Sequence, residues 1–100
     1  MDAGCGTGSV LVNLAKKFHV WGIDTSPEML SICQDKLFEE GSQAVLLEMD
    51  IRNITLPIQV DAVICLCDTL NYLLEEEELL KSFQNMFNVL IPGGSLIFDM

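Results

Sequence analysis

Short apolar runs alternate along this chain with stretches in which apolar residues recur at helical spacing. The runs lie at about residues 20–24, 44–49, 61–66 and 95–100, and residues 1–3 give the stub of one more. Brief, continuous apolar runs of this kind are typical of strands buried on both faces in a parallel sheet. The pattern therefore predicts five strands separated by helical connections.

Helical spacing and end signals predict three helices between these strands. Ser26 precedes Pro27 and Glu28, an order that favours a helix start, and Gly41 favours its end. The run Glu75–Glu78 is predicted to be the solvated first turn of the last helix, where acids complement the helix dipole. Pro92–Gly94 is expected to stop that helix before the fifth strand. The predicted helices cover about residues 8–17, 26–40 and 75–90.

The alternation of strands and helices predicts an α/β domain with right-handed crossovers between parallel strands. A glycine-rich stretch, residues 2–8, follows the first strand and has the spacing G-x-G-x-G. Glycine permits positive φ and close approach of a ligand, and a following helix start presents free N–H groups. Asp24 comes twenty residues after Gly4, at the end of the next strand, where a dinucleotide-binding unit has its ribose-binding acid.

These stretches resemble the motifs of the class I S-adenosylmethionine-dependent methyltransferases. Residues 2–8 are similar to the first motif of that family and residues 22–30 to the second. Residues 49–51 resemble its third contact point, residues 61–64 its fourth strand, and residues 90–94 the turn before its fifth strand. The resemblance implies a Rossmann-like doubly wound parallel sheet in the order 3-2-1-4-5. It also implies that strand one is truncated and that the last two strands of the family are absent. Residues 1–100 are thus expected to be a partial S-adenosylmethionine-binding methyltransferase core.

The same resemblance assigns a set of cofactor-binding residues. Loop glycines are expected beside the methionyl and ribose portions, the Asp24 carboxylate on the ribose hydroxyls, and Asp50 with the Ile51 N–H at the adenine. The full expected set is Asp2, Gly4, Cys5, Gly6, Gly8, Asp24, Thr25, Met29, Asp50, Ile51, Leu66 and Cys67.

Candidate catalytic residues follow the fourth strand. Asp68 could accept a proton from a nitrogen or oxygen nucleophile, and Asn71 and Tyr72 could orient that nucleophile. The alternative is that Asp68 and Asn71 cap a turn and Tyr72 packs. Because a sulfonium is already a good leaving group, alignment could supply much of the rate without a dedicated acid or base. The methyl acceptor is expected to be a small molecule or RNA.

Charge and cysteine usage limit the partners. The formal net charge is −10, with five basic residues against fifteen acids, so direct DNA binding and binding to an anionic membrane are not expected. The four cysteines lack C-x-x-C spacing, and only one histidine is present, so no metal site is predicted. Unpaired thiols are typical of a cytoplasmic protein.

Two other interpretations stay open. The first is a nicotinamide-dependent oxidoreductase. Ser9 argues against it, because a dinucleotide-binding fingerprint has its third glycine at this position. The second is a non-catalytic fragment, since the family holds its acceptor with segments outside this core. A truncated first strand also predicts a marginal monomer that could form homo-oligomers through exposed sheet edges.

Overall fold

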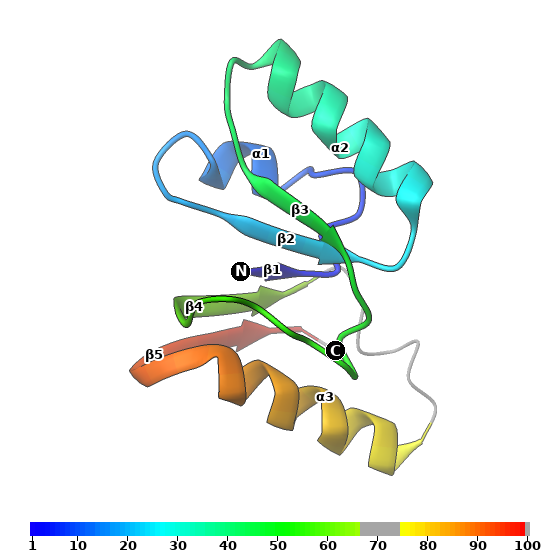
Figure 1. The fold of residues 1–100 in the computed structure, drawn as a ribbon, viewed down its shortest axis with the longest axis vertical. Helices are drawn as coiled ribbons and strands as arrows, with labels where there is room; N and C mark the ends of the chain where they lie inside the picture. The colour runs from blue at the N-terminus through cyan, green and yellow to red at the C-terminus, as the bar shows by residue number, and fades with distance from the viewer. Residues whose placement is uncertain (67–74, 100) are drawn as a thin grey trace.

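The computed structural model describes residues 1–66 and 75–99, and within them five strands form one parallel sheet (Figure 1). The strand order across the sheet is β3-β2-β1-β4-β5. The Rossmann-like order predicted from the sequence is therefore confirmed, and the strand order reverses between β1 and β4. The strands are β1 (Asp2–Ala3), β2 (Trp21–Asp24), β3 (Val45–Glu48), β4 (Val60–Cys65) and β5 (Leu90–Phe98).

The first strand is short but still joins the two halves of the sheet. Asp2 lies opposite Gly22 of β2 and Ile64 of β4. Met1 extends this pairing, because its ammonium group donates to the Ala62 carbonyl at 2.8 Å and its carbonyl accepts from the Ile64 N–H at 2.9 Å. Strands β2 and β4 are thus both tied to β1 next to the glycine-rich loop.

Three helices accompany the sheet: α1 (Leu11–Leu14), α2 (Pro27–Glu39) and α3 (Glu76–Val89). The predicted start of α2 is confirmed, because the Met29 N–H donates to Ser26 Oγ at 3.3 Å and Pro27 occupies the first turn. The prediction of a helix over residues 8–17 is wrong in extent. Gly8 has φ +88°, which no α-helix accommodates, so α1 begins only at Leu11. Of the described helices, none is both long enough and apolar enough to span a bilayer.

The prediction that Pro92–Gly94 stops the last helix is also wrong. The helix ends at Val89, and β5 runs continuously from Leu90 to Phe98. Its pairing with β4 moves from Leu90 to Ser95 while β4 advances only from Val60 to Ala62. The proline and the two glycines therefore form a bulge inside the strand, where extra residues lie without partners in the ladder.

Each face of the sheet has its own buried cluster. On one face Met86 of α3 packs with Ile23 and Val63, and on the other Leu11 and Leu37 pack with the thiol of Cys33. Leu11 and Leu37 have no exposed surface, and burial of such side chains stabilises a fold by roughly 1.5–3 kcal/mol each. Figure 1 shows α1 and α2 beside β2 and β3, and α3 beside β4 and β5.

Candidate functional site

The carboxyl ends of the parallel strands bring the predicted motifs to one edge. The glycine-rich loop follows β1, Asp24 ends β2, and Asp50 follows β3. Ala3 lies opposite Ile23, Asp24 lies opposite Glu48, and the Met49 N–H donates to the Asp24 carbonyl at 3.1 Å. Asp24 and Asp50 therefore lie at the same end of neighbouring strands, as the sequence predicted. Ligands of open parallel sheets bind at this end, beside the reversal of strand order.

The glycine-rich loop turns sharply after β1 and is fixed by main-chain hydrogen bonds. The N–H groups of Gly4 and Cys5 both donate to the Ile23 carbonyl, at 2.8 and 2.9 Å. Gly6 and Gly8 have φ values of +55° and +88°, a region that side chains rarely adopt. A Cβ added to Gly6 would meet no atom within 4 Å, whereas one added to Gly8 would lie 2.6 Å from Cys33 Sγ. Gly8 therefore faces the core, and Gly6 borders open space.

Asp24 is held by backbone N–H groups of the glycine-rich loop and of the residues that begin α2. Its Oδ2 accepts from the Gly6 N–H at 2.9 Å, and its Oδ1 accepts from the Ser26 N–H at 2.9 Å. Each carboxylate oxygen has room for about one further hydrogen bond. One side chain thus links the glycine loop to the start of α2 and retains acceptor capacity for a ligand.

Asp50 is held by both the side chain and the backbone N–H of Arg52. Its Oδ1 accepts from the Arg52 N–H at 2.8 Å and from Arg52 Nε at 2.9 Å, and its Oδ2 accepts from a terminal guanidinium nitrogen of Arg52 at 2.6 Å. The hydrogen bonds from this guanidinium lower the pKa of Asp50, so the carboxylate is ionised at neutral pH. Arg52 also donates to Glu78 of α3 at 3.0 Å. Glu78 is therefore paired, although the sequence predicted only a solvated first turn.

A cavity of about 300 Å³ lies on the glycine loop and is bordered by Asp2, Gly4, Gly6, Met29 and Leu66. Asp2 is buried, and this burial together with the nearby Asp24 charge raises its pKa to about 6, while the Met1 ammonium acts in the opposite direction. Six residues of the predicted cofactor set, the five named above and Cys5, thus border this one cavity. The residues that border this cavity do not include Asp24 or Asp50.

The described cysteines are buried free thiols rather than nucleophiles. Burial raises the pKa of Cys5 to about 12 and that of Cys65 to about 11, and it also raises the pKa of Cys33. A thiol needs a lowered pKa to be reactive at neutral pH. Cys5 therefore belongs to the site as a small loop residue. Within residues 1–66 and 75–99, no three potential metal ligands gather at one point.

The other predicted residues differ in what the structure says of them. Thr25 is exposed beside the crevice, and the Ile51 side chain is buried in the core under α3. Cys67 and the candidate catalytic residues Asp68, Asn71 and Tyr72 lie outside the described residues. Sequence reasoning missed Arg52 and Asn85, which hold the loop after β3. The available signal was a base two positions after a strand-end acid, a spacing that permits a fork-like ion pair.

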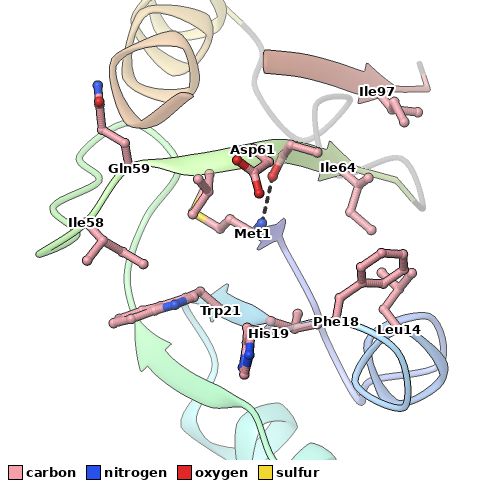
Figure 2. A pocket seen from close by; sticks show the side chains of 13 residues that line it. Met1, Leu14, Phe18, His19, Trp21, Ile58, Gln59, Asp61, Ile64 and Ile97 are labelled. Atoms are coloured by element: carbon pink, nitrogen blue, oxygen red, sulfur yellow. Dashed lines mark hydrogen bonds between the residues drawn. The ribbon is translucent and has the colours of Figure 1, made fainter. Parts of the chain in front are cut away.

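A second cavity, of about 380 Å³, lies on the side of β1 and β4 away from the glycine loop (Figure 2). Trp21 and Ile58 stand near the starts of β2 and β4, and Ile64 and Ile97 contribute apolar surface from β4 and β5. Figure 2 shows Asp61 beside the Met1 ammonium group. The cavity is mainly apolar and is not bordered by the glycine-rich loop, so the glycine-loop cavity is the candidate site.

Comparisons with known proteins agree with this geometry. The sequence pattern of a methyltransferase domain family matches residues 1–94. A putative methyltransferase, YqeM of Bacillus subtilis (strain 168), is 46% identical over 103 residues, which cover 100% of this chain and 41% of that protein. A glycine/sarcosine N-methyltransferase of Aphanothece halophytica is 33% identical over 102 residues, covering 99% of this chain and 38% of the relative.

Solved structures with the same fold include cofactor-dependent enzymes. An S-adenosylmethionine-dependent methyltransferase from Clostridium acetobutylicum ATCC 824 superposes with a TM-score of 0.95 at 36% identity, over 99% of this chain and 41% of the other. CalS10, an amino pentose methyltransferase from Micromonospora echinaspora solved with S-adenosylmethionine bound, gives a TM-score of 0.89 at 35% identity, over 97% and 40% of the two chains. The chain thus spans about two fifths of the length of these relatives.

Proposed function

This chain belongs to the S-adenosylmethionine-dependent methyltransferases, and from that premise we propose that residues 1–100 form the cofactor-binding core of an enzyme that methylates a small molecule. The observation that carries the proposal is that the glycine loop borders a cavity of about 300 Å³ and, through the Gly6 N–H, also binds the Asp24 carboxylate at the same edge of the sheet. This edge lies where the strand order reverses, at the position expected for a nucleotide-like ligand.

We assign the recognition of the ribose and methionyl portions to the first half of the sheet. Asp24 accepts from the two ribose hydroxyls with the acceptor positions that Gly6 and Ser26 leave. Gly4 and Gly6 let the backbone approach the ligand, and Asp2 faces its ammonium group. Cys5 and Gly8 shape the loop from behind.

Adenine recognition is assigned to the loops after β2, β3 and β4. Thr25 and Met29 border one side of the base, and Leu66 and Cys67 the other. Asp50 accepts from the exocyclic amino group. The Ile51 N–H donates to the ring, while the Ile51 side chain stays in the core.

The proposed chemistry is methyl transfer by direct displacement. When bound, the sulfonium supplies an activated methyl group and leaves as a neutral thioether. This chain aligns the reacting groups, and alignment of this kind can contribute about 7–11 kcal/mol. Asp68 takes the proton released by the acceptor, and Asn71 and Tyr72 orient the attacking atom.

The acceptor class is inferred from the relatives and from charge. The glycine/sarcosine N-methyltransferase and the amino pentose methyltransferase both carry small amine substrates in their names. The net charge of −10 disfavours RNA, whose phosphates require basic surface. We therefore propose a small-molecule amine and place the protein in the cytoplasm, where its free thiols stay reduced.

Exposed strand edges support a further part of the proposal, self-association. Strands β3 and β5 lie at the two edges of the sheet, and Val45 and Phe98 are 42% and 45% exposed there. Unpaired edges favour pairing with another copy. Sedimentation at several concentrations should then show a mass that rises with concentration, and a constant monomer would contradict this part.

Calorimetric titration tests the cofactor assignment. The chain is expected to bind S-adenosylmethionine and not NAD. Binding of NAD alone would restore the oxidoreductase interpretation. A labelled-methyl assay with glycine, an amino sugar nucleotide and RNA then separates the acceptor classes. Label in RNA would overturn the small-molecule assignment. Cofactor binding without turnover would favour the non-catalytic fragment, an alternative that the comparison with YqeM supports because the chain covers 41% of that protein.

A further inference from the structure

Arg52 connects the loop after β3 to helix α3 through its guanidinium group. Two of its nitrogens form a fork with the two carboxylate oxygens of Asp50, at 2.9 and 2.6 Å. A third nitrogen donates to Glu78 in the first turn of α3, at 3.0 Å. Bidentate pairs of this kind fix the orientation of both groups more strictly than a point charge does.

The backbone of the same loop is fixed separately by Asn85 of α3. The Ile54 N–H donates to Asn85 Oδ1 at 2.8 Å, and Asn85 Nδ2 donates to the Arg52 carbonyl at 3.1 Å. Ile51 and Ile54 are buried beneath the loop. The path of the main chain therefore does not depend on the Arg52 guanidinium, whose principal effect falls on the Asp50 carboxylate.

A count of acceptor positions shows what Asp50 can still do. A carboxylate offers about four acceptor positions, two on each oxygen. Oδ1 already accepts from the Arg52 N–H and from Nε, and Oδ2 accepts once from the terminal nitrogen. One position on Oδ2 is left, and it can receive a donor but cannot contribute one. Hydrogen bonds from Arg52 also lower the pKa of Asp50 below its ordinary value.

We propose that Arg52 is a positioning residue that makes the site select a 6-amino purine over a 6-oxo purine. By occupying the other acceptor positions of Asp50, Arg52 leaves one acceptor aimed at a single donor, which an exocyclic amino group supplies and a carbonyl cannot. The inference rests on the proposed function, in which Asp50 contacts the adenine. It adds a residue that contacts no ligand itself but sets the identity of the base.

The test compares two ligands in three proteins by calorimetry. The ligands are S-adenosylhomocysteine and its 6-oxo analogue S-inosylhomocysteine, and the proteins are the wild type, Arg52→Met and Glu78→Gln. The wild type is expected to prefer the adenosyl ligand at least tenfold, because a site that loses a paired polar contact binds the analogue poorly. Arg52→Met should reduce this preference to about threefold or less. Without the guanidinium, the Asp50 carboxylate is not held in one orientation, and the hydrogen bond that it accepts from the amino group is no longer fixed. Glu78→Gln keeps the fork and should retain the preference.

The outcomes separate the inference from its premise. No binding of S-adenosylhomocysteine by the wild type would defeat the proposed function itself. Equal binding of the two ligands by the wild type, or an equal loss for both in Arg52→Met, would overturn the role of Arg52 and leave the cofactor assignment standing. If Arg52→Met unfolds, Arg52→Lys replaces it: a lysine keeps the charge without the fork, so an unchanged preference in that variant would also overturn the proposal.

Discussion

The two acids at the carboxyl edge of the sheet are held in different ways. Asp24 is bound by the backbone N–H groups of Gly6 and Ser26, which lie close to it in the folded motif. Asp50 is bound mainly by the side chain of Arg52 and also by its N–H. Glu78 of α3 holds the Arg52 guanidinium, and Asn85 of α3 fixes the backbone of the loop. We call this edge the rim; its first half consists of the glycine loop and Asp24, and its second half of Asp50 and the loop after β3. The first half is therefore built from main-chain geometry, and the second half mainly from side chains that packing brings together.

The largest effect is expected from Asp24→Ala. The variant removes an acceptor for both ribose hydroxyls and also releases the Gly6 and Ser26 N–H groups. Because a hydrogen bond to a charged group contributes about 1.5–3 kcal/mol, affinity for S-adenosylmethionine should fall by about 10- to 150-fold. Calorimetry gives the change directly. Asp24→Asn, which keeps the size and one oxygen, should lose less, and unchanged affinity in Asp24→Ala would remove Asp24 from the ribose.

A pair of glycine variants tests whether backbone geometry builds the first half. Gly8→Ala places a Cβ 2.6 Å from Cys33 Sγ at a φ of +88°, so the free energy of unfolding should fall by about 2–3 kcal/mol. Gly6 has a φ of +55° and no atom within 4 Å of an added Cβ, so Gly6→Ala should lower the free energy of unfolding by only about 1 kcal/mol. The added methyl group should also weaken cofactor binding by steric conflict. Urea denaturation measures both. Equal losses of stability would mean that contact with Cys33 does not constrain the loop.

The same contrast explains what the sequence could predict. The strand order, the glycine loop and Asp24 were accessible because each depends on local signals: apolar runs, glycine spacing and a strand-end acid. Helix α1 was predicted too long because the requirement of Gly8 for positive φ overrides the helical spacing that follows it. The bulge in β5 is not predictable in this way, because proline and glycine signal a break in an element but do not indicate whether the strand ladder resumes after it.

The second half of the rim was less accessible from the sequence. Arg52 and Glu78 are 26 positions apart, and Ile54 and Asn85 are 31 positions apart. Neither pair carries a spacing that predicts contact, since both depend on how α3 packs across the sheet. Acids in a first helical turn are usually solvated, which is why Glu78 was assigned no partner.

Asn85→Ala tests the side-chain half. The variant leaves the Ile54 N–H without its acceptor and removes the donors to the carbonyls of Arg52 and Lys81. Since Ile54 is buried, the free energy of unfolding should fall by about 1–2 kcal/mol. Hydrogen exchange should show faster exchange of the Ile54 amide and little change at Gly6. Asn88→Ala, on an exposed position of the same helix, is the matched control and should change neither quantity.

Asp2→Asn is expected to change how the stability of the fold depends on pH. Asp2 is buried at the base of the glycine loop, and its pKa is raised to about 6 in the fold from an ordinary value of 3.8. The fold therefore disfavours the ionised form, so this group lowers the stability of the wild type as pH rises from about 4 to 6, and the penalty persists above that range. Asparagine carries no such charge, and this rise in pKa corresponds to roughly 2–3 kcal/mol, so Asp2→Asn should be more stable than the wild type by about 2 kcal/mol at pH 7 and nearly equal to it at pH 4. Urea titrations of both proteins between these pH values measure the gap. A gap that narrows as pH rises would mean that the carboxylate is stabilised by its surroundings, and the backbone half of the rim would then contain a charge that the fold favours.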